Sequence, residues 1–255
     1  ALVLLGLHDE AESFIERALS VARSARPAAW TALALQGAGR IAFSRRDVAR
    51  GRECVRQAQS IYSAIGAGRH AAAMNVILGE CEFEAGNVEL AYETAAAALP
   101  AFVKAGDTIT LAAAHVNLAT CCIELRRWNA ARHHAREGLD AARSARYVVG
   151  IACALQHLAG IVCFSEGDEE RVVSPYGDVA RVVGYVDATL ARIGASHEAN
   201  EQREHDRIVD ALRANVSPDA LSSLFAAGAA MAAERAFELA LSLDGSDARE
   251  QTSSA

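Results

Sequence analysis

The chain has 255 residues, of which 52% are hydrophobic, only 5% are aromatic and 57 are Ala, and its formal net charge is -7. This composition is too apolar for a disordered chain, and the lack of dense Val, Ile, Thr and Tyr clusters argues against a β-sandwich or barrel. The negative charge leaves no electrostatic footprint for nucleic acid, and no apolar run reaches the roughly 18 residues of a membrane span. Because Ala favours helices and carries little bulk, we expect an all-α protein with closely approaching helices.

Apolar and small residues recur at helical spacing along most of the chain, between short turn signals. We expect a remnant hairpin with helices at about 1–5 and 8–24. Four full hairpins follow, with paired helices at about 28–44 and 47–65, 68–85 and 88–104, 107–125 and 128–144, and 147–165 and 176–194. An acidic turn at 166–171 and the helix-opening pair Ser174-Pro175 divide the last hairpin. Shorter helices are expected at about 199–214, 218–229 and 231–243, and Ser217-Pro218 opens the second of them.

The sequence repeats itself with a period of 40 residues. Small residues fall in register in three columns, which are Ala11, Gly51, Ala91 and Ala131; Ala18, Ala58, Ala98 and Gly138; and Gly39, Gly79 and Ala119, with Gly160 after a slip of one residue. Larger side chains at these places would push neighbouring helices apart. The columns therefore predict a helix-turn-helix unit that recurs along the chain.

These positions resemble the tetratricopeptide repeat family. The second full repeat carries Leu78-Gly79, the turn residue Gly86, Ala91 and Ala98-Leu99 at the family's positions. The period of 40 exceeds the family's usual period of about 34 residues, which indicates longer helices, and the Pro that often closes a repeat is missing at most junctions. The resemblance implies a right-handed α-solenoid over residues 1–194, capping helices over 195–243 and a disordered tail at 244–255.

Residues 181–243 carry a second resemblance, through the segment Arg181–Ala188, a Glu-rich helix with His205-Asp206-Arg207, and the segment Glu234–Leu241. They are similar to the C-terminal end of large bacterial multidomain proteins, namely predicted signal-transduction ATPases and LuxR-type or winged-helix transcriptional regulators. The resemblance implies a nucleotide-binding module upstream, and the chain itself contains no GxxxxGK[ST] phosphate loop. Since the sequence starts without Met and inside a repeat, we expect it to be part of a longer polypeptide.

The six Cys form no CxxC pair, and their intervals fit no metal site. We expect buried, reduced thiols in a cytoplasmic protein that holds neither metal nor cofactor. An alternative concerns Cys121 and Cys122. Adjacent side chains of a helix cannot both face one core, so one of the two thiols would be partly exposed and open to oxidation.

A ligand groove is the main functional prediction, because the first helix of each hairpin lines the concave face in proteins of the resembled family. Carried over position by position, the resemblance assigns to this groove Gln36, Arg40, Phe43, Val76, Glu80, Phe83, Glu84, Val116, Thr120, Ile123, His157, Ile161 and Phe164. Phe43, Phe83, Ile123 and Phe164 would form an apolar ladder, or alternatively pack between repeats. Gln36 and Arg40 stand where a carboxylate clamp would need Lys and Asn, so recognition of a peptide C-terminus is not supported.

Other polar constellations favour structural roles. His133 and His134 point about 100° apart on a helix, which suits surface or hairpin-interface residues better than a shared metal. Glu80 and Glu84 share a helix face, but no nucleophile accompanies them, so we interpret that face as solvated. We therefore predict a non-catalytic scaffold or sensor that binds a protein, a peptide or a small inducer and works with upstream domains, without touching nucleic acid or membrane. One alternative is a free-standing scaffold that self-associates through its N-terminal hairpin. Another is an enzyme, but no set of residues in the sequence indicates a catalytic site.

Overall fold

In the computed structural model, the described residues are 28–165 and 175–243, together with the single helical positions 13, 17 and 20. These residues form helices and the turns between them, and no strand occurs in the described part of the chain, so the all-α prediction is confirmed. The chain divides into two compact units, Ala1–Cys121 and Cys122–Ala255. This division falls inside a helix, and the boundary between repeat and capping helices expected after residue 194 stays a prediction.

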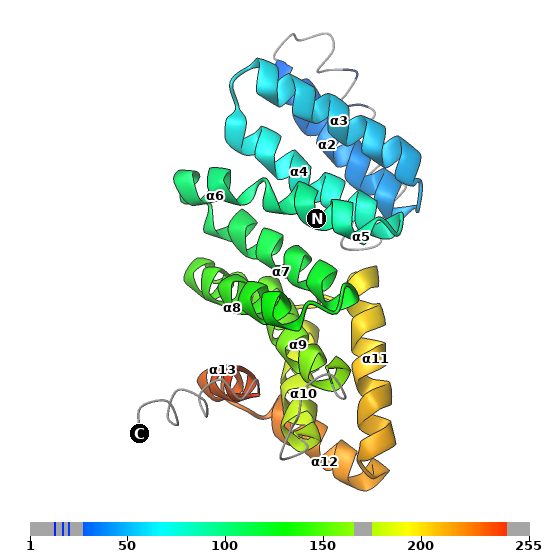
Figure 1. Cartoon of the computed structure of the whole chain (residues 1–255), viewed down its shortest axis with the longest axis vertical. Helices are drawn as coiled ribbons and strands as arrows, with labels where there is room; N and C mark the ends of the chain where they lie inside the picture. The colour runs from blue at the N-terminus through cyan, green and yellow to red at the C-terminus, as the bar shows by residue number, and fades with distance from the viewer. Residues whose placement is uncertain (1–12, 14–16, 18–19, 21–27, 166–174, 244–255) are drawn as a thin grey trace. The chain divides into compact units, whose positions relative to one another are not determined.

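The helices of the first unit match the expected ranges closely (Figure 1). They are α2 (Ala28–Ser44), α3 (Val48–Ala64), α4 (Gly68–Glu84), α5 (Val88–Ala96), α6 (Leu99–Ala105) and α7 (Thr108–Glu124), the last of which crosses the division between the units. Consecutive helices α2, α3, α4 and α5 pack against one another along the chain. The expected hairpin at 1–24, the acidic turn at 166–171 with Ser174, and the tail at 244–255 lie outside the described residues.

One turn geometry recurs every twenty residues. Residues 46, 66, 86, 106, 126 and 146 all have positive φ, and each donates its N–H to the carbonyl three residues back. The following residue donates to the carbonyl five residues back, which completes a Schellman motif. That same following residue then accepts the first hydrogen bond of the next helix, as Asp47 does from the Gly51 N–H at 3.0 Å. Each helix therefore begins as soon as the previous one has ended.

A break between α5 and α6 corrects the single helix expected at 88–104. Helix α5 ends at Ala96, and α6 begins at Leu99 with Pro100 in its first turn. Pro100 has no N–H to donate to the Ala96 carbonyl, and its ring clashes with that carbonyl in a continuous helix. The chain instead closes a tighter turn, in which Ala98 N–H donates to the Ala95 carbonyl at 3.1 Å.

Small residues mark the closest helix crossings of the first unit, as the repeat predicted. A Cβ on Gly79 of α4 would lie 3.0 Å from the Ala91 carbonyl oxygen of α5. A Cβ on Gly39 of α2 would lie 2.6 Å from a methyl group of Val55 on α3. Buried side chains fill the space around these crossings, with Met74 and Phe102 among the largest.

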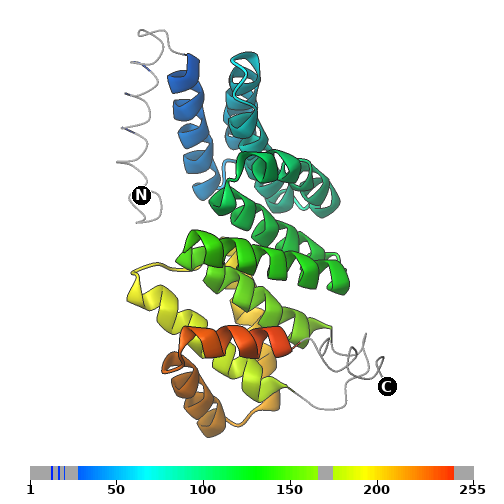
Figure 2. The ribbon, with the colours of Figure 1, turned by 90° about the vertical axis from the view of Figure 1, so that its left-hand side faces the viewer.

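The second unit contains α8 (Trp128–Ala145), α9 (Val148–Phe164), α10 (Tyr176–Arg192), α11 (Ala199–Asn215), α12 (Pro218–Ala229) and α13 (Ala233–Ser242). Helix α9 packs between α8 and α10, α12 runs along α10, and α13 crosses both α9 and α10 (Figure 2). Helix α10 opens at Tyr176 with Pro175 as its N-cap residue, one position later than Ser174-Pro175 suggested. Ser217 and Pro218 open α12 as predicted.

Two glycines lie at a close helix contact in the second unit. A Cβ on Gly184 of α10 would meet the Phe225 carbonyl oxygen of α12 at 2.4 Å. A Cβ on Gly228 of α12 would meet the Arg181 carbonyl oxygen of α10 at 2.0 Å. The two helices therefore touch backbone to backbone at both points. Among the described helices, none combines the length and the apolar character required to cross a membrane.

Candidate functional site

The first helices of the hairpins in the first unit are neighbours. Helix α2 contacts α4, and the Asn117 side-chain amide of α7 donates to Glu80 Oε1 of α4 at 2.8 Å. Helices α2, α4 and α7, the last up to Cys121, thus bring the equivalent polar positions of successive hairpins near one another. We use the name first-helix face for the predicted groove positions, taken separately in each unit: those on α2, α4 and α7 in the first, and those on α9 in the second.

The polar residues of this face differ in their exposure. Arg40 and Glu84 are exposed. Gln36 is half-buried and accepts a long hydrogen bond from the Tyr62 hydroxyl at 3.5 Å. The Thr120 hydroxyl donates to the Val116 carbonyl within its own helix at 3.2 Å. Glu80 is half-buried and bonded to Asn117, so its carboxylate is not simply solvated as the sequence suggested.

The apolar positions of the face largely point into the protein. Val76 packs with Ala98, Phe102 and Ala114, and Ile123 is only 3% exposed. The Phe43 ring lies so close to Gly51 of α3 that a Cβ there would fall 2.2 Å from it. Phe83 is half-buried. The predicted ladder is therefore not an open strip, and packing between helices describes Phe43 and Ile123 better.

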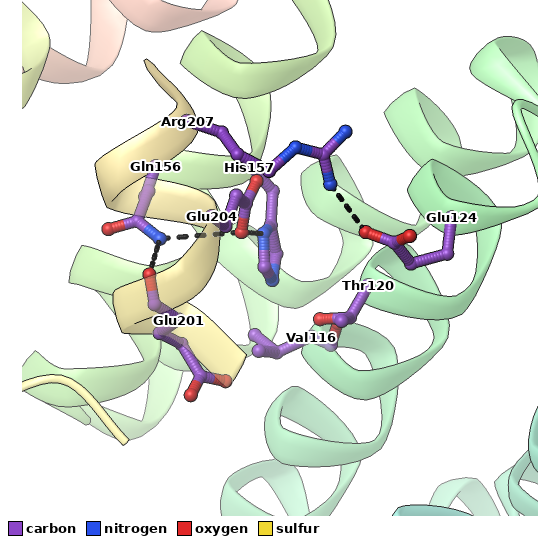
Figure 3. Close-up of polar contacts among 8 residues, drawn as sticks. All are labelled: Val116, Thr120, Glu124, Gln156, His157, Glu201, Glu204 and Arg207. Atoms are coloured by element: carbon purple, nitrogen blue, oxygen red, sulfur yellow. Dashed lines mark hydrogen bonds and ion pairs between the residues drawn. The ribbon is translucent and has the colours of Figure 1, made fainter. Parts of the chain in front are cut away.

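The remaining predicted positions, His157, Ile161 and Phe164, lie on α9, and α11 packs against that helix (Figure 3). His157 is fully buried, with Nδ1 2.6 Å from Glu204 Oε2 of α11, and Ile161 is 1% exposed. A Cβ on Gly160 would meet Glu204 Oε1 at 2.6 Å, so the missing side chain leaves the room that the carboxylate fills. The chain's own helix thus occupies the α9 part of the first-helix face.

A polar network joins α9 to the beginning of α11. The buried Gln156 side-chain amide donates to the Glu201 carbonyl at 2.9 Å and to Glu204 Oε2 at 3.3 Å (Figure 3). Burial raises the pKa of the Glu201 carboxyl from its usual 4.5 to about 7. A backbone hydrogen bond and the nearby His157 act in the opposite direction but do not cancel the effect of burial. Burial, together with the nearby Glu201 and Glu204, also raises the pKa of the Cys153 thiol well above its usual value.

Arg207 closes the outer edge of this contact. Its guanidinium donates to Glu124 Oε1 at 2.6 Å (Figure 3). The same guanidinium lies over the Phe164 ring, 4.3 Å from the ring centre. Arg207 and Glu124 are each about half exposed, so their ion pair contributes little to stability. The Arg207 side chain therefore covers a ring that the sequence assigned to the groove.

A second group of titratable residues lies where α10 turns into α11. His205 Nε2 is 3.0 Å from Asp187 Oδ1, and the His197 ring packs 4.9 Å from the His205 ring. The close carboxylate of Asp187 raises the pKa of His205 in spite of its burial. Burial and the neighbouring His205 lower the pKa of His197. Of these two histidines, His205 therefore holds a proton more readily than His197 does.

The adjacent histidines and the cysteines have structural surroundings. His133 is exposed and His134 buried, in agreement with surface and interface roles. Cys121 and Cys122 are both buried, so the alternative of a partly exposed thiol is wrong: both of these adjacent side chains of α7 are covered although they point in different directions. All six Cys are free thiols. Within the described ranges, no group of three His, Cys, Asp or Glu side chains could hold a metal ion.

Sequence reasoning missed the residues of α11 that meet α9. Glu201, Glu204 and Arg207 are spaced three apart, which places them along one side of a helix. That spacing could have identified a polar face on α11. No local signal indicates that this face packs against α9, because the contacting residues are far apart in the sequence: His157 and Glu204 are separated by 47 residues. Comparison with known proteins adds no assignment, since no protein-family model and no curated protein matches the chain.

Proposed function

We propose that the chain is a non-catalytic binding module, similar to a tetratricopeptide-repeat α-solenoid, that recognises a protein, a peptide or a small inducer on its first-helix face. The main support is the twenty-residue recurrence of one turn geometry, together with the adjacency of α2, α4 and α7. Repetition of one unit builds an extended binding surface rather than a single catalytic cleft. Arg40 and Glu84 are the exposed groups through which such a face selects its partner.

The resemblance of residues 181–243 to the ends of bacterial signal-transduction ATPases and transcriptional regulators supports a regulatory setting. In this proposal the module senses a partner and reports to domains of the same polypeptide upstream of the repeat. The alternative of a self-associating scaffold finds some support in Trp30 and Leu33, whose side chains are 61% and 50% exposed on α2. The mass of the protein by light scattering, measured over a range of concentrations, separates the two proposals.

Photo-crosslinking tests the binding face directly. A photoreactive amino acid replaces Arg40 on α2 in one variant and Arg56 in another, the latter being an exposed arginine on the second helix α3. We expect a discrete adduct in cells from position 40 and none from position 56, because only the former lies on the first-helix face. Equal labelling from both positions, or none from position 40, would contradict the proposal.

A charge reversal complements this experiment. With the photoreactive group at Glu84, Arg40→Glu should lower the adduct yield, whereas the matched Arg56→Glu should not. Both arginines are exposed, so neither change should shift the melting temperature by more than the small amounts typical of surface substitutions.

A further inference from the structure

The contact of α11 with the rest of its unit differs between its two halves. The first half meets α9 through Glu201 and Glu204, whose partners are polar. The second half buries Ile208, Val209 and Leu212, and these are apolar. Apolar burial stabilises at any pH, whereas the polar half depends on which groups carry protons. The two halves can therefore respond differently to conditions.

Several buried polar atoms in the polar half of the contact lack hydrogen-bond partners. Ten buried side-chain nitrogen and oxygen atoms in the described part of the chain lack a hydrogen-bond partner, and six of them surround the first half of α11. These six are Gln156 Oε1, His197 Nε2, Glu201 Oε2, Glu204 Oε1, and both ring nitrogens of His205, whose contacts with Asp187 and Asp206 do not have hydrogen-bond geometry. A buried polar atom without a partner recovers hydration when the contact opens, so this half is the weakly held part of the unit.

Non-helical residues bound α11 at both ends. Before it, Gly194 has a φ of +65° and Glu198 is extended. After it, Val216 is extended before α12 begins. Changes of a few backbone angles at these joints allow such a helix to tilt about its buried second half.

We propose that α11 is a hinged strap over the α9 part of the first-helix face, and that its first half lifts more readily as the pH rises toward neutrality. Lifting would expose Gln156, His157 and Phe164. The occupant that this face then fits is an amphipathic helix of α11's own chemistry, with two carboxylates three residues apart and an arginine three residues further on. On α9, the His157 imidazole and the Gln156 amide both meet the second carboxylate, that of Glu204. The same amide donates to the Glu201 backbone carbonyl, and the Phe164 ring lies under the arginine. The use of the uncovered face rests on the proposed function, whereas the lifting of α11 does not.

The direction of the pH effect follows from the protons held in the seated state. Glu201 faces His157 and Cys153 of α9 and the neighbouring Glu198 and Glu204, and its pKa of about 7 lies above its usual 4.5. A seated α11 thus keeps a proton on Glu201 that a lifted α11 loses, so lifting becomes easier from about pH 4.5 to 7 and then levels off. His205, which faces Asp187, Asp206 and His197, acts in the same direction because its pKa is raised. His197 opposes them, because its pKa is lowered and its seated state is weakened in acid.

Hydrogen exchange measured by mass spectrometry tests the lifting in the full chain at several pH values, after correction for the intrinsic pH dependence of exchange. We expect the opening of residues 199–207 to increase by up to about tenfold per pH unit between 5 and 7, and residues in α4 to show no such change. Glu201→Gln, which stays neutral, should remove most of the increase. Glu137→Gln, at an exposed position of α8, is the matched control and should leave it intact. A pH-independent α11, or identical profiles for the two variants, overturns the proposal.

A synthetic peptide of residues 199–215 tests the occupant separately. Glu204→Lys in the chain places a cation against His157 and should unseat α11, which the exchange measurement verifies. A fluorescent peptide should then bind this variant at least about tenfold more tightly than it binds the intact protein, and a peptide carrying Glu204→Gln should lose most of that binding. Absence of peptide binding to a verified open variant overturns the occupant. If Glu204→Lys fails to fold, the pH series on the intact protein still decides the strap. Loss of the position-40 adduct alone would overturn only the proposed function.

Discussion

The backbone contact between α10 and α12 allows a sharp test of packing. In Gly228→Ala the new Cβ would lie 2.0 Å from the Arg181 carbonyl oxygen, and in Gly184→Ala it would lie 2.4 Å from that of Phe225. Ordinary contact begins at 3.4 Å, so relief requires local movements of about 1.4 and 1.0 Å. The atoms in the way are backbone, which no side-chain rotation can remove. The two helices must therefore separate.

The expected cost follows from two opposing effects. Overpacking of this kind lowers the free energy of unfolding by about 1–3 kcal/mol, while replacing Gly by Ala inside a helix raises it by about 0.5–1 kcal/mol. We expect a net loss of about 1–2 kcal/mol for Gly184→Ala and a larger loss for Gly228→Ala. Each kcal/mol lowers the melting temperature of a protein of this size by about 2–4 °C.

The matched control lies in the same helix as Gly184. A Cβ on Gly177 would have only the Arg181 guanidinium within reach, at 3.9 Å, so Gly177→Ala should stay within about 0.5 kcal/mol of the parent or exceed it. Urea unfolding followed by helical circular dichroism measures all three variants. If Gly184→Ala and Gly228→Ala proved as stable as Gly177→Ala, the close crossing and the reasoning built on it would be refuted.

Two further predictions concern the first unit. Gly79→Leu forces a side chain toward the Ala91 carbonyl, 3.0 Å from its Cβ, and should destabilise by about 1–3 kcal/mol in the same urea assay; an unchanged midpoint would contradict the repeat register. Asp107 accepts hydrogen bonds from the Thr110 N–H and hydroxyl, so Asp107→Ala should cost about 1 kcal/mol at pH 7. Burial raises the pKa of Asp107, but hydrogen bonds from Arg69 and Thr110 outweigh it and hold the pKa below its usual 3.8. The stabilisation by Asp107 is therefore present at neutral pH and is lost as the carboxyl is protonated in acid, so the difference between parent and variant should shrink as the pH falls below the usual pKa of 3.8; a constant difference would contradict the role of the carboxylate.

Helix positions were largely predictable because two independent signals coincide in this chain. Small residues such as Gly79 and Ala91 mark the crossings, and turn residues such as Gly66, Gly86 and Gly106 mark the ends of helices. The turns at Arg46, Arg126 and Arg146 carry no glycine, yet they adopt the same left-handed conformation. Their positions were predictable only from the repeat, since arginine by itself gives no turn signal. Pro100 was visible, but its breaking of α5 from α6 was not foreseen.

The site was less predictable, because its residues meet through tertiary packing. Helical periodicity places His157 on α9 and Glu204 on α11 without relating the two helices. The burial of Val76 and Ile123 also depends on which neighbours cover α4 and α7. A family position assigns a residue to a face, but a helix added from further along the same chain can cover that face.

The recurring turn leaves no spare residue between helices, since the residue that completes one Schellman motif also begins the next helix. A single inserted residue would disturb both ends of the junction. Removal of a complete forty-residue unit, for example 68–107, would instead bring the end of α3 onto the beginning of α7 through a turn of unchanged geometry. The architecture therefore favours change in length by whole modules: such a chain can gain or lose recognition surface in discrete steps while every remaining junction stays the same.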